Sequence, residues 1–189
     1  MQAFELTILN WIQAHLRCGV LDAVMVPVSR ICDHGEVWIL LAAILLAIPK
    51  TRKLGTCVAC GLALDLLFCN LALKPLIGRV RPFAVNPTVS LLIPPPTDAS
   101  FPSGHTAAAC GVWLLLLLPE FFPRLQKRRT ACGIASTLYV CLAGFSRIVV
   151  GKHFLSDVAA GMLLMLLGFA LLCLVAQRLL PREGSTKTA

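Results

Sequence analysis

Three short segments of the sequence hold the side chains that could do chemistry: residues 74–82, 101–105 and 146–157. Together they supply three basic groups, two histidines and one carboxylate, namely Lys74, Arg81, Arg147, His105, His153 and Asp157. Lysine and arginine bind phosphate oxygens, arginine through a planar fork of N–H donors. Ser103 and Gly104 open an apolar run, where the free N–H groups and the dipole of a helix favour an anion. The set predicts a phosphate site.

The two histidines indicate catalysis at that phosphate. His153 and Asp157 are four residues apart at the predicted start of a helix, so we expect them on one face. A carboxylate bonded to one imidazole nitrogen fixes the tautomer and activates the other nitrogen as a nucleophile. His105 has no carboxylate four residues away, and we expect it to be protonated near neutral pH, as a general acid requires. Two histidines and an aspartate could instead hold zinc, but the cations nearby would repel it, so we predict no metal and no cofactor.

The composition predicts a membrane protein. Of 189 residues, 58% are hydrophobic and 14% charged, and the mean hydropathy is +0.83. Soluble domains are about 45–50% apolar and about 25% charged. The net charge of +8 lies in short loops, which favours anionic lipid headgroups over nucleic acid as partners. Cys57 and Cys60 form a C-x-x-C that could be redox-active or bind metal, but no second pair accompanies them and buried thiols are the better interpretation.

Six apolar runs divide the chain: 19–33, 36–49, 54–73, 103–119, 130–149 and 154–180. A spanning helix needs about 20 apolar residues, so the first two runs are the weakest and the count is five or six. The first 17 residues lack a signal peptide and place Phe4, Trp11 and Leu16 at helical spacing, which predicts an amphipathic helix on the membrane surface.

Basic clusters between the runs decide the count. They are Lys50, Arg52 and Lys53, then Arg124, Lys127, Arg128 and Arg129, then Arg178, Arg182 and Lys187. Six spans place all three clusters on one side, which the positive-inside rule makes cytoplasmic. We therefore predict an all-α bundle of six transmembrane helices after an interfacial helix, as one domain over residues 1–180 with a disordered tail at 181–189. The three chemical segments then share the outer face, where basic residues need a reason beyond interfacial anchoring.

Other polar residues have plainer interpretations. The outer loop 74–102 is rich in proline, so we expect no helix in it. Asp65 and Asn70 lie inside an apolar run, where a functional role is possible but an interhelical hydrogen bond is the preferred explanation. Asp33, His34 and Glu36 form the first outer turn, and we expect them to be solvated.

The three segments resemble the type 2 phosphatidic acid phosphatase superfamily, which includes lipid phosphate phosphatases and vanadium haloperoxidases. The family pattern K-x6-R-P, P-S-G-H and S-R-x5-H-x3-D is matched without a substitution. The resemblance implies that His153 attacks phosphorus to form a phosphohistidine, that Asp157 orients it and that His105 serves as acid and then base. It also implies that five residues hold the phosphate: Lys74, Arg81, Ser103, Gly104 and Arg147. Arg79 is not a fixed position of the pattern, and we leave it outside the set.

The expected function is hydrolysis of a membrane lipid phosphate or diphosphate. Undecaprenyl diphosphate is the first choice of substrate, and phosphatidylglycerol phosphate or phosphatidate the second. A lipid phosphotransferase is an alternative; a non-catalytic transporter or scaffold is disfavoured because every motif position is intact. The small size resembles bacterial members, which implies a cytoplasmic membrane location with the active site on the extracytoplasmic side. We infer membrane lipids as partners and no obligate protein partner.

Overall fold

The computed structural model describes residues 2–31, 33, 35–116 and 129–179. Every regular element in these ranges is a helix, which confirms the all-α prediction. The α-helices are α1 (Gln2–His15), α2 (Gly19–Ile31), α3 (Glu36–Ala47), α4 (Arg52–Asp65), α5 (Lys74–Ile77), α6 (Pro82–Val85), α7 (Gly104–Leu116), α8 (Arg129–Val149) and α9 (Leu155–Leu179). His34, residues 117–128 with most of the second basic cluster, and the tail 181–189 lie outside the described residues.

The third apolar run is part of a long helical stretch from Arg52 to Ile77. In it α4 passes into a π-helical segment, Leu66–Leu73, which leads directly into α5. Among the described residues, the stretch within Pro49–Val85 is the one long and apolar enough to cross a membrane by length and composition. Shorter apolar helices cover Glu36–Ala47, Gly133–Val149 and Leu155–Gly168. The predicted runs therefore appear as helices, and the number of spans stays a prediction.

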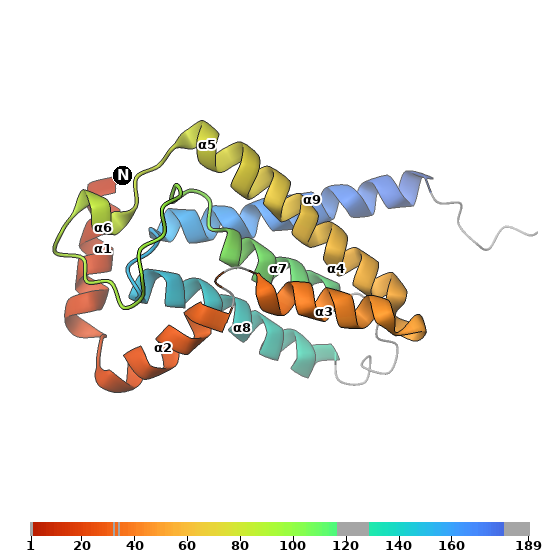
Figure 1. Ribbon diagram of the computed structural model, residues 1–189, viewed down its shortest axis with the longest axis horizontal. Coiled ribbons are helices and arrows are strands. Elements are labelled where there is room, and N and C mark those ends of the chain that lie inside the picture. The colour runs from red at the N-terminus through yellow and green to blue at the C-terminus, as the bar shows by residue number, and fades with distance from the viewer. Residues whose placement is uncertain (1, 32, 34, 117–128, 180–189) are drawn as a thin grey trace, which may run out of the picture.

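Helix α7 packs against α4, α8 and α9, while α3 packs on α4 and α2 on α8 (Figure 1). Around its axis α7 carries small buried side chains at four consecutive positions, Ala107, Ala108, Ala109 and Cys110, which let the helices on its several sides approach closely. The approach is tightest at Gly161 of α9, where a Cβ atom would lie 2.5 Å from the carbonyl oxygen of Ser103. This contact fixes the start of α7, which carries the segment 101–105, against α9.

The proline-rich segment contains two short helices, α5 and α6, so the prediction that it holds no helix is wrong. Each helix has a proline in its first turn, Pro75 and Pro82. Pro82 follows the extended residue Arg81 and removes no intrahelical hydrogen bond, because the first N–H groups of a helix have no partner within it. Pro75 instead lies within the continuous helical stretch, just after the π-helical segment passes into α5. The rest of the segment, residues 86–103, has neither helix nor strand.

The N-terminal segment is helical as predicted, and the large apolar side chains of its predicted face are turned away from the protein. Glu5 is buried together with Leu9 and Ile12, whereas Phe4 and Trp11 are 69% and 53% exposed. The side chain of Gln13 donates to the carbonyl of Ser90 (2.9 Å) and accepts from the Ser90 N–H (3.0 Å). Helix α1 therefore packs its Glu5 side on the protein, against the proline-rich segment, and presents large apolar side chains outward.

Candidate active site

The turn between α8 and α9 holds His153, which lies before α9 begins at Leu155 and not in a first helical turn as predicted. The Asp157 Oδ2 atom accepts the N–H of Phe154 at 2.9 Å. This is the bond in which an acidic side chain in the first turn caps the start of its own helix. Gly151, with φ of 79°, makes the preceding turn. The histidine therefore sits at the tip of a capped turn, in contact with its aspartate.

His153 is neutral and has one nitrogen available for reaction. Its Nδ1 atom lies 3.5 Å from Asp157 Oδ2, within ion-pair range although outside hydrogen-bond geometry. Its Nε2 atom lies 3.2 Å from Arg81 Nη1, which has only protons to offer, so Nε2 carries the lone pair and Nδ1 the proton. Burial, together with the nearby Arg81 and Arg147 guanidinium groups, lowers the pKa of His153 to about 3. The geometry thus leaves Nε2 as the nucleophilic atom.

Lys74 and Arg81 are joined by one carboxylate, that of Asp98. Arg81 Nη2 lies 2.7 Å from Asp98 Oδ1, and the Lys74 ammonium pairs with Oδ2. Burial alone would raise the pKa of Asp98, but the Lys74 and Arg81 charges hold it at about 2. The two cations are therefore close enough to bind two oxygens of one anionic group, although their side chains come from opposite ends of the first motif.

Arg147 and His105 meet at a second carboxylate, Asp33, which also pairs with Lys152. Asp33 Oδ1 lies 3.0 Å from Arg147 Nη1, 3.3 Å from Lys152 Nζ and 3.2 Å from His105 Nε2, the last outside hydrogen-bond geometry. Burial would raise the pKa of Asp33, but the nearby His105, Arg147 and Lys152 hold it well below its usual range. Asp33 is thus no solvated turn residue, and His105, which has no carboxylate four residues away in the sequence, meets one supplied by another element.

The backbone of the segment 101–105 contacts α9. The Ser103 N–H donates to the carbonyl of Asp157 at 3.0 Å, so it is engaged within the protein and not free for an anion as predicted. The Ser103 hydroxyl lies 3.0 Å from that of Thr106. A Cβ atom on Gly104 would meet Asn70 at 3.5 Å and Asp65 at 3.6 Å, which is ordinary contact. The Asp65 Oδ1 atom is buried and has no hydrogen-bond partner in the described part of the chain, so the expected interhelical bond is not made there.

Two basic residues of the site were missed by the sequence reasoning, Arg79 and Lys152. Arg79 Nη1 donates to Asp157 Oδ1 at 2.5 Å, and the Lys152 carbonyl accepts from Arg81 Nη1 at 2.9 Å. Arg79 could have been found from its place two residues before Arg81: in an extended segment that spacing points the two side chains to the same side. Altogether the structure brings five cations together with four carboxylates, namely Lys74, Arg79, Arg81, Arg147 and Lys152 with Glu5, Asp33, Asp98 and Asp157.

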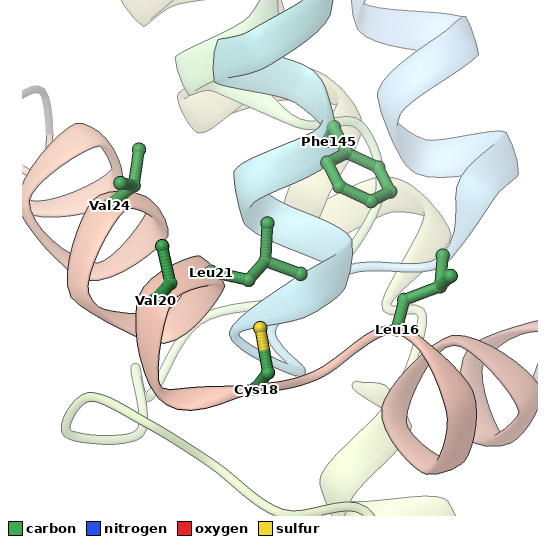
Figure 2. Close-up of a pocket in the computed structure, with 6 residues that line it drawn as sticks. All are labelled: Leu16, Cys18, Val20, Leu21, Val24 and Phe145. Atoms are coloured by element: carbon green, nitrogen blue, oxygen red, sulfur yellow. The ribbon is translucent and has the colours of Figure 1, made fainter.

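Other parts of the described chain offer no comparable site. No group of three His, Cys, Asp or Glu side chains suited to a metal ion occurs among residues 2–31, 33, 35–116 and 129–179. A surface hollow of about 440 Å³ lies where the α1–α2 connection faces α8 (Figure 2). Its lining is apolar: Leu16, Cys18, Val20, Leu21, Val24 and Phe145. It carries no group that could act on phosphate.

A bundle of apolar helices that gathers cations around a buried histidine–aspartate pair is the architecture of a membrane phosphatase. The sequence pattern of the PAP2 superfamily matches residues 54–181. The chain therefore belongs to the PAP2 superfamily, whose phosphatases act on phosphate esters.

Named relatives agree with this assignment. An undecaprenyl-diphosphatase of Sulfolobus acidocaldarius is 36% identical over 149 residues, covering 77% of this chain and 66% of that protein, just under two thirds of its length. An undecaprenyl-diphosphatase of Bacillus subtilis is 32% identical over 156 residues, covering 80% and 73%. Among solved structures, the transmembrane PAP2-type phosphatidylglycerolphosphate phosphatase of Bacillus subtilis superposes with a TM-score of 0.78 at 26% identity, over 96% of this chain and 89% of that one. Aquifex aeolicus LpxE gives 0.70 at 26% identity, over 89% and 94%.

Proposed function

We propose that the protein hydrolyses undecaprenyl diphosphate to undecaprenyl phosphate and inorganic phosphate through a phosphohistidine on His153. The observation that carries the reaction is the state of His153: neutral, buried, with Nδ1 toward Asp157 and Nε2 beside Arg81. The substrate is supported by two relatives of over 30% identity that each match more than three quarters of the chain, both of them undecaprenyl-diphosphatases.

In the first step, the Nε2 lone pair forms a bond to the terminal phosphorus and the bond from that phosphorus to the bridging oxygen breaks. The imidazole becomes cationic, and Asp157 stabilises the proton on Nδ1. His105 donates a proton to the departing oxygen of undecaprenyl phosphate. In the second step, water gives a proton to His105 and its oxygen bonds to phosphorus, while the N–P bond breaks and phosphate leaves. His105 stands beside Arg147 through their shared partner Asp33, on the same side of the site as the phosphate-binding cations.

The proposed phosphate site consists of Lys74, Arg81, Ser103, Gly104 and Arg147. Three of these carry fixed positive charge, and preorganised charge of this kind stabilises the developing negative charge on phosphoryl oxygens. Asp98 bridges Lys74 and Arg81 as two oxygens of a phosphate would. Substrate entry therefore exchanges this carboxylate for phosphate. For the serine, the contribution comes from its hydroxyl, since its N–H is held by α9.

The proposal includes six membrane spans within one domain, residues 1–180, and an extracytoplasmic active site in a bacterial cytoplasmic membrane. In Figure 1 the α3–α4 turn, the start of α8 and the end of α9 lie at one end of the bundle, and the α8–α9 turn lies at the other. The described members of the basic clusters belong to these elements: Lys50, Arg52 and Lys53 to the α3–α4 turn and the start of α4, Arg129 to the start of α8 and Arg178 to the end of α9. This supports a cytoplasmic position for that end. Fusions of alkaline phosphatase after Pro96 and after Pro49 test this: activity from the first alone is expected, and the reverse result would invert the topology.

Phosphatidylglycerol phosphate is the second candidate substrate. It is favoured by the TM-score of 0.78 with the phosphatidylglycerolphosphate phosphatase. A phosphatidylglycerophosphatase B of Bacillus subtilis is also 38% identical, over 105 residues that make up 54% of this chain. The groups described above are polar or charged and recognise phosphate, so both substrates fit the same chemistry.

The deciding experiment measures phosphate release by detergent-purified protein from undecaprenyl diphosphate, phosphatidylglycerol phosphate and phosphatidate. His153→Ala tests the nucleophile, and His15→Ala, at an exposed histidine of α1, is the matched control. We expect release from undecaprenyl diphosphate that His153→Ala abolishes, His15→Ala preserves and EDTA leaves unchanged. Release by His153→Ala would overturn the nucleophile, and loss in EDTA would restore a metal mechanism. A phosphorylated acceptor lipid in place of free phosphate would identify a phosphotransferase.

A further inference from the structure

Arg79 connects the N-terminal helix α1 to the carboxylate beside His153. Its Nη1 donates to Asp157 Oδ1 at 2.5 Å and its Nη2 to Glu5 Oε2 at 2.6 Å. The side chains of Asp157 and Glu5 are 0% and 6% exposed. A buried carboxylate needs a charged or hydrogen-bonding partner to stay ionised, and Arg79 is a partner that these two share.

Several contacts hold the Arg79 guanidinium in one orientation. Its centre lies 4.2 Å from the ring centroid of Phe154, in a cation–π contact. Nη1 also donates to the Ser156 hydroxyl at 2.6 Å. The other Glu5 oxygen accepts the Ser156 N–H at 2.8 Å, so Glu5 binds both Arg79 and the first turn of α9. A planar fork held by two carboxylates and one ring cannot rotate without breaking several of these contacts.

The two oxygens of Asp157 have separate partners. Oδ1 accepts from Arg79, whereas Oδ2 accepts from the Ser100 hydroxyl and the Phe154 N–H and faces His153 Nδ1. By engaging Oδ1, Arg79 leaves Oδ2 directed at the imidazole. The Arg79 backbone contributes as well, since its carbonyl accepts the Ser100 N–H at 2.8 Å.

We infer that Arg79 and Glu5 are positioning residues for the His153–Asp157 pair. Arg79 holds Asp157 ionised and oriented, and Glu5 holds Arg79 from α1. The inference rests on the proposed role of His153 as the nucleophile. When Nε2 bonds to phosphorus the imidazole gains positive charge, so the step depends on an ionised Asp157 at Nδ1. Three N–H donors of Arg79 are directed at Glu5, Ser156 and Asp157, so it acts through the aspartate and not on the phosphate.

The test compares Arg79→Gln, Arg79→Lys and Glu5→Gln with Arg17→Gln. Arg17 pairs with Asp22 at 3.0 Å, an arginine–carboxylate contact just after α1 that lies outside the site, and is the matched control. We expect kcat of Arg79→Gln to fall on the order of 10–100-fold, as when the residue orienting a catalytic group is lost, with KM unchanged within about twofold. Arg79→Lys should be intermediate, because lysine keeps the charge but not the planar fork. Glu5→Gln should lower kcat in the same direction.

The acidic limb of the pH profile of kcat/KM gives a readout that a merely structural role of Arg79 would leave unchanged. His153 is surrounded by Arg81, Arg147 and Asp157. Arg79 binds the other oxygen of Asp157, so removing its positive charge makes protonation of the imidazole easier. The acidic limb should therefore move to higher pH in Arg79→Gln and stay in place in Arg17→Gln. Equal kcat and equal limbs in the two variants would overturn the inference. A raised KM with unchanged kcat would assign Arg79 to substrate binding instead.

Vanadate binding separates failure of this inference from failure of the proposed function. Vanadate forms a bond to the nucleophile with the five-coordinate geometry of the phosphoryl transition state, and it needs no lipid. Its Kd therefore reports directly on the nucleophilicity of His153. We expect Arg79→Gln and Glu5→Gln to weaken vanadate binding and Arg17→Gln to leave it unchanged. Wild-type protein that binds vanadate but releases phosphate from no lipid would refute the substrate, and the vanadate series would still decide the positioning role. If Arg79→Gln does not fold, Glu5→Gln, which keeps the side-chain shape, decides it in the same way.

Discussion

Replacing Asp98 by asparagine is expected to tighten phosphate binding. Asp98 bridges Lys74 and Arg81 and is 47% exposed, so it is the carboxylate that an entering phosphate displaces from these cations. Asparagine keeps the shape and one acceptor oxygen but removes the competing charge. The inhibition constant of inorganic phosphate, the product of the proposed reaction, should therefore fall.

The size of the effect follows from the electrostatics of Asp98. Its pKa drops from 3.8 to about 2 next to Lys74 and Arg81. At about 1.4 kcal/mol per tenfold change in proton affinity, this corresponds to roughly 2.5 kcal/mol of interaction. Because the side chain is half exposed, solvent screening reduces the usable part to about 1 kcal/mol. That predicts a decrease in the phosphate inhibition constant of about fivefold.

The assay measures phosphate release at a fixed lipid concentration across a series of added inorganic phosphate. Asp22→Asn is the matched control, because Asp22 forms its own ion pair with Arg17 away from the site. An inhibition constant that stays the same or rises in Asp98→Asn, relative to Asp22→Asn, would refute the reasoning. It would mean that Asp98 organises the cations for phosphate and does not compete with it.

Two further predictions concern stability. The pKa of His153 is lowered from 6.5 to about 3 in the folded protein. Below pH 6.5 this histidine therefore binds a proton in the unfolded chain but stays neutral in the folded protein. The free energy of unfolding should therefore fall as the pH falls from 6.5 to 4.5, by up to about 1.4 kcal/mol per pH unit from this residue. In detergent, the Tm of His153→Gln should fall less steeply with acidification than that of the control His15→Gln. Equal dependence of Tm on pH in the two variants would contradict a neutral His153. Gly161→Ala would place a methyl 2.5 Å from the Ser103 carbonyl oxygen, whereas Gly168 has open space around it. We expect Gly161→Ala to lower the free energy of unfolding by about 1–3 kcal/mol, measured as a lower Tm. It should also lose phosphate release, because the segment 101–105 moves. A Tm equal to that of Gly168→Ala would show that the helices adjust to the added methyl.

The helices could be predicted because their signal is local. Each apolar run corresponds to a helix, since a run of apolar residues needs a helical backbone to satisfy its own hydrogen bonds in lipid. The proline-rich segment was mispredicted in part, because proline count alone ignores position: Pro82 stands in the first turn of α6, where proline is tolerated. His153 was placed on a helix by its spacing to Asp157, but the cap that Asp157 makes to Phe154 starts the helix later.

Three basic residues of the site, Lys74, Arg81 and Arg147, could be predicted, and three of the four carboxylates could not. Lysine and arginine on an outer face are unexpected under the positive-inside rule, and the patterns K-x6-R-P and S-R-x5-H-x3-D define their positions. Glu5, Asp33 and Asp98 carry no such signal, because each reaches the site from a separate part of the chain. Glu5 lies 74 residues from Arg79 and Asp33 lies 114 from Arg147. Such pairs depend on how helices pack, which composition and local spacing do not determine.

Exposure divides the four carboxylates of the site into two kinds. Asp157 and Glu5 are 0% and 6% exposed and bind Arg79, the cation that touches the histidine–aspartate pair. Asp98 and Asp33 are 47% and 22% exposed and bind Lys74, Arg81, Arg147 and Lys152, the cations around the phosphate position. A buried carboxylate that leaves its partner loses far more than a half-exposed one, which regains water. Phosphate can therefore displace Asp98 and Asp33 at low cost while the Asp157–Arg79–Glu5 chain stays fixed. The same arrangement thus gives the site removable counter-ions where substrate must enter and a permanent one where the nucleophile must be held.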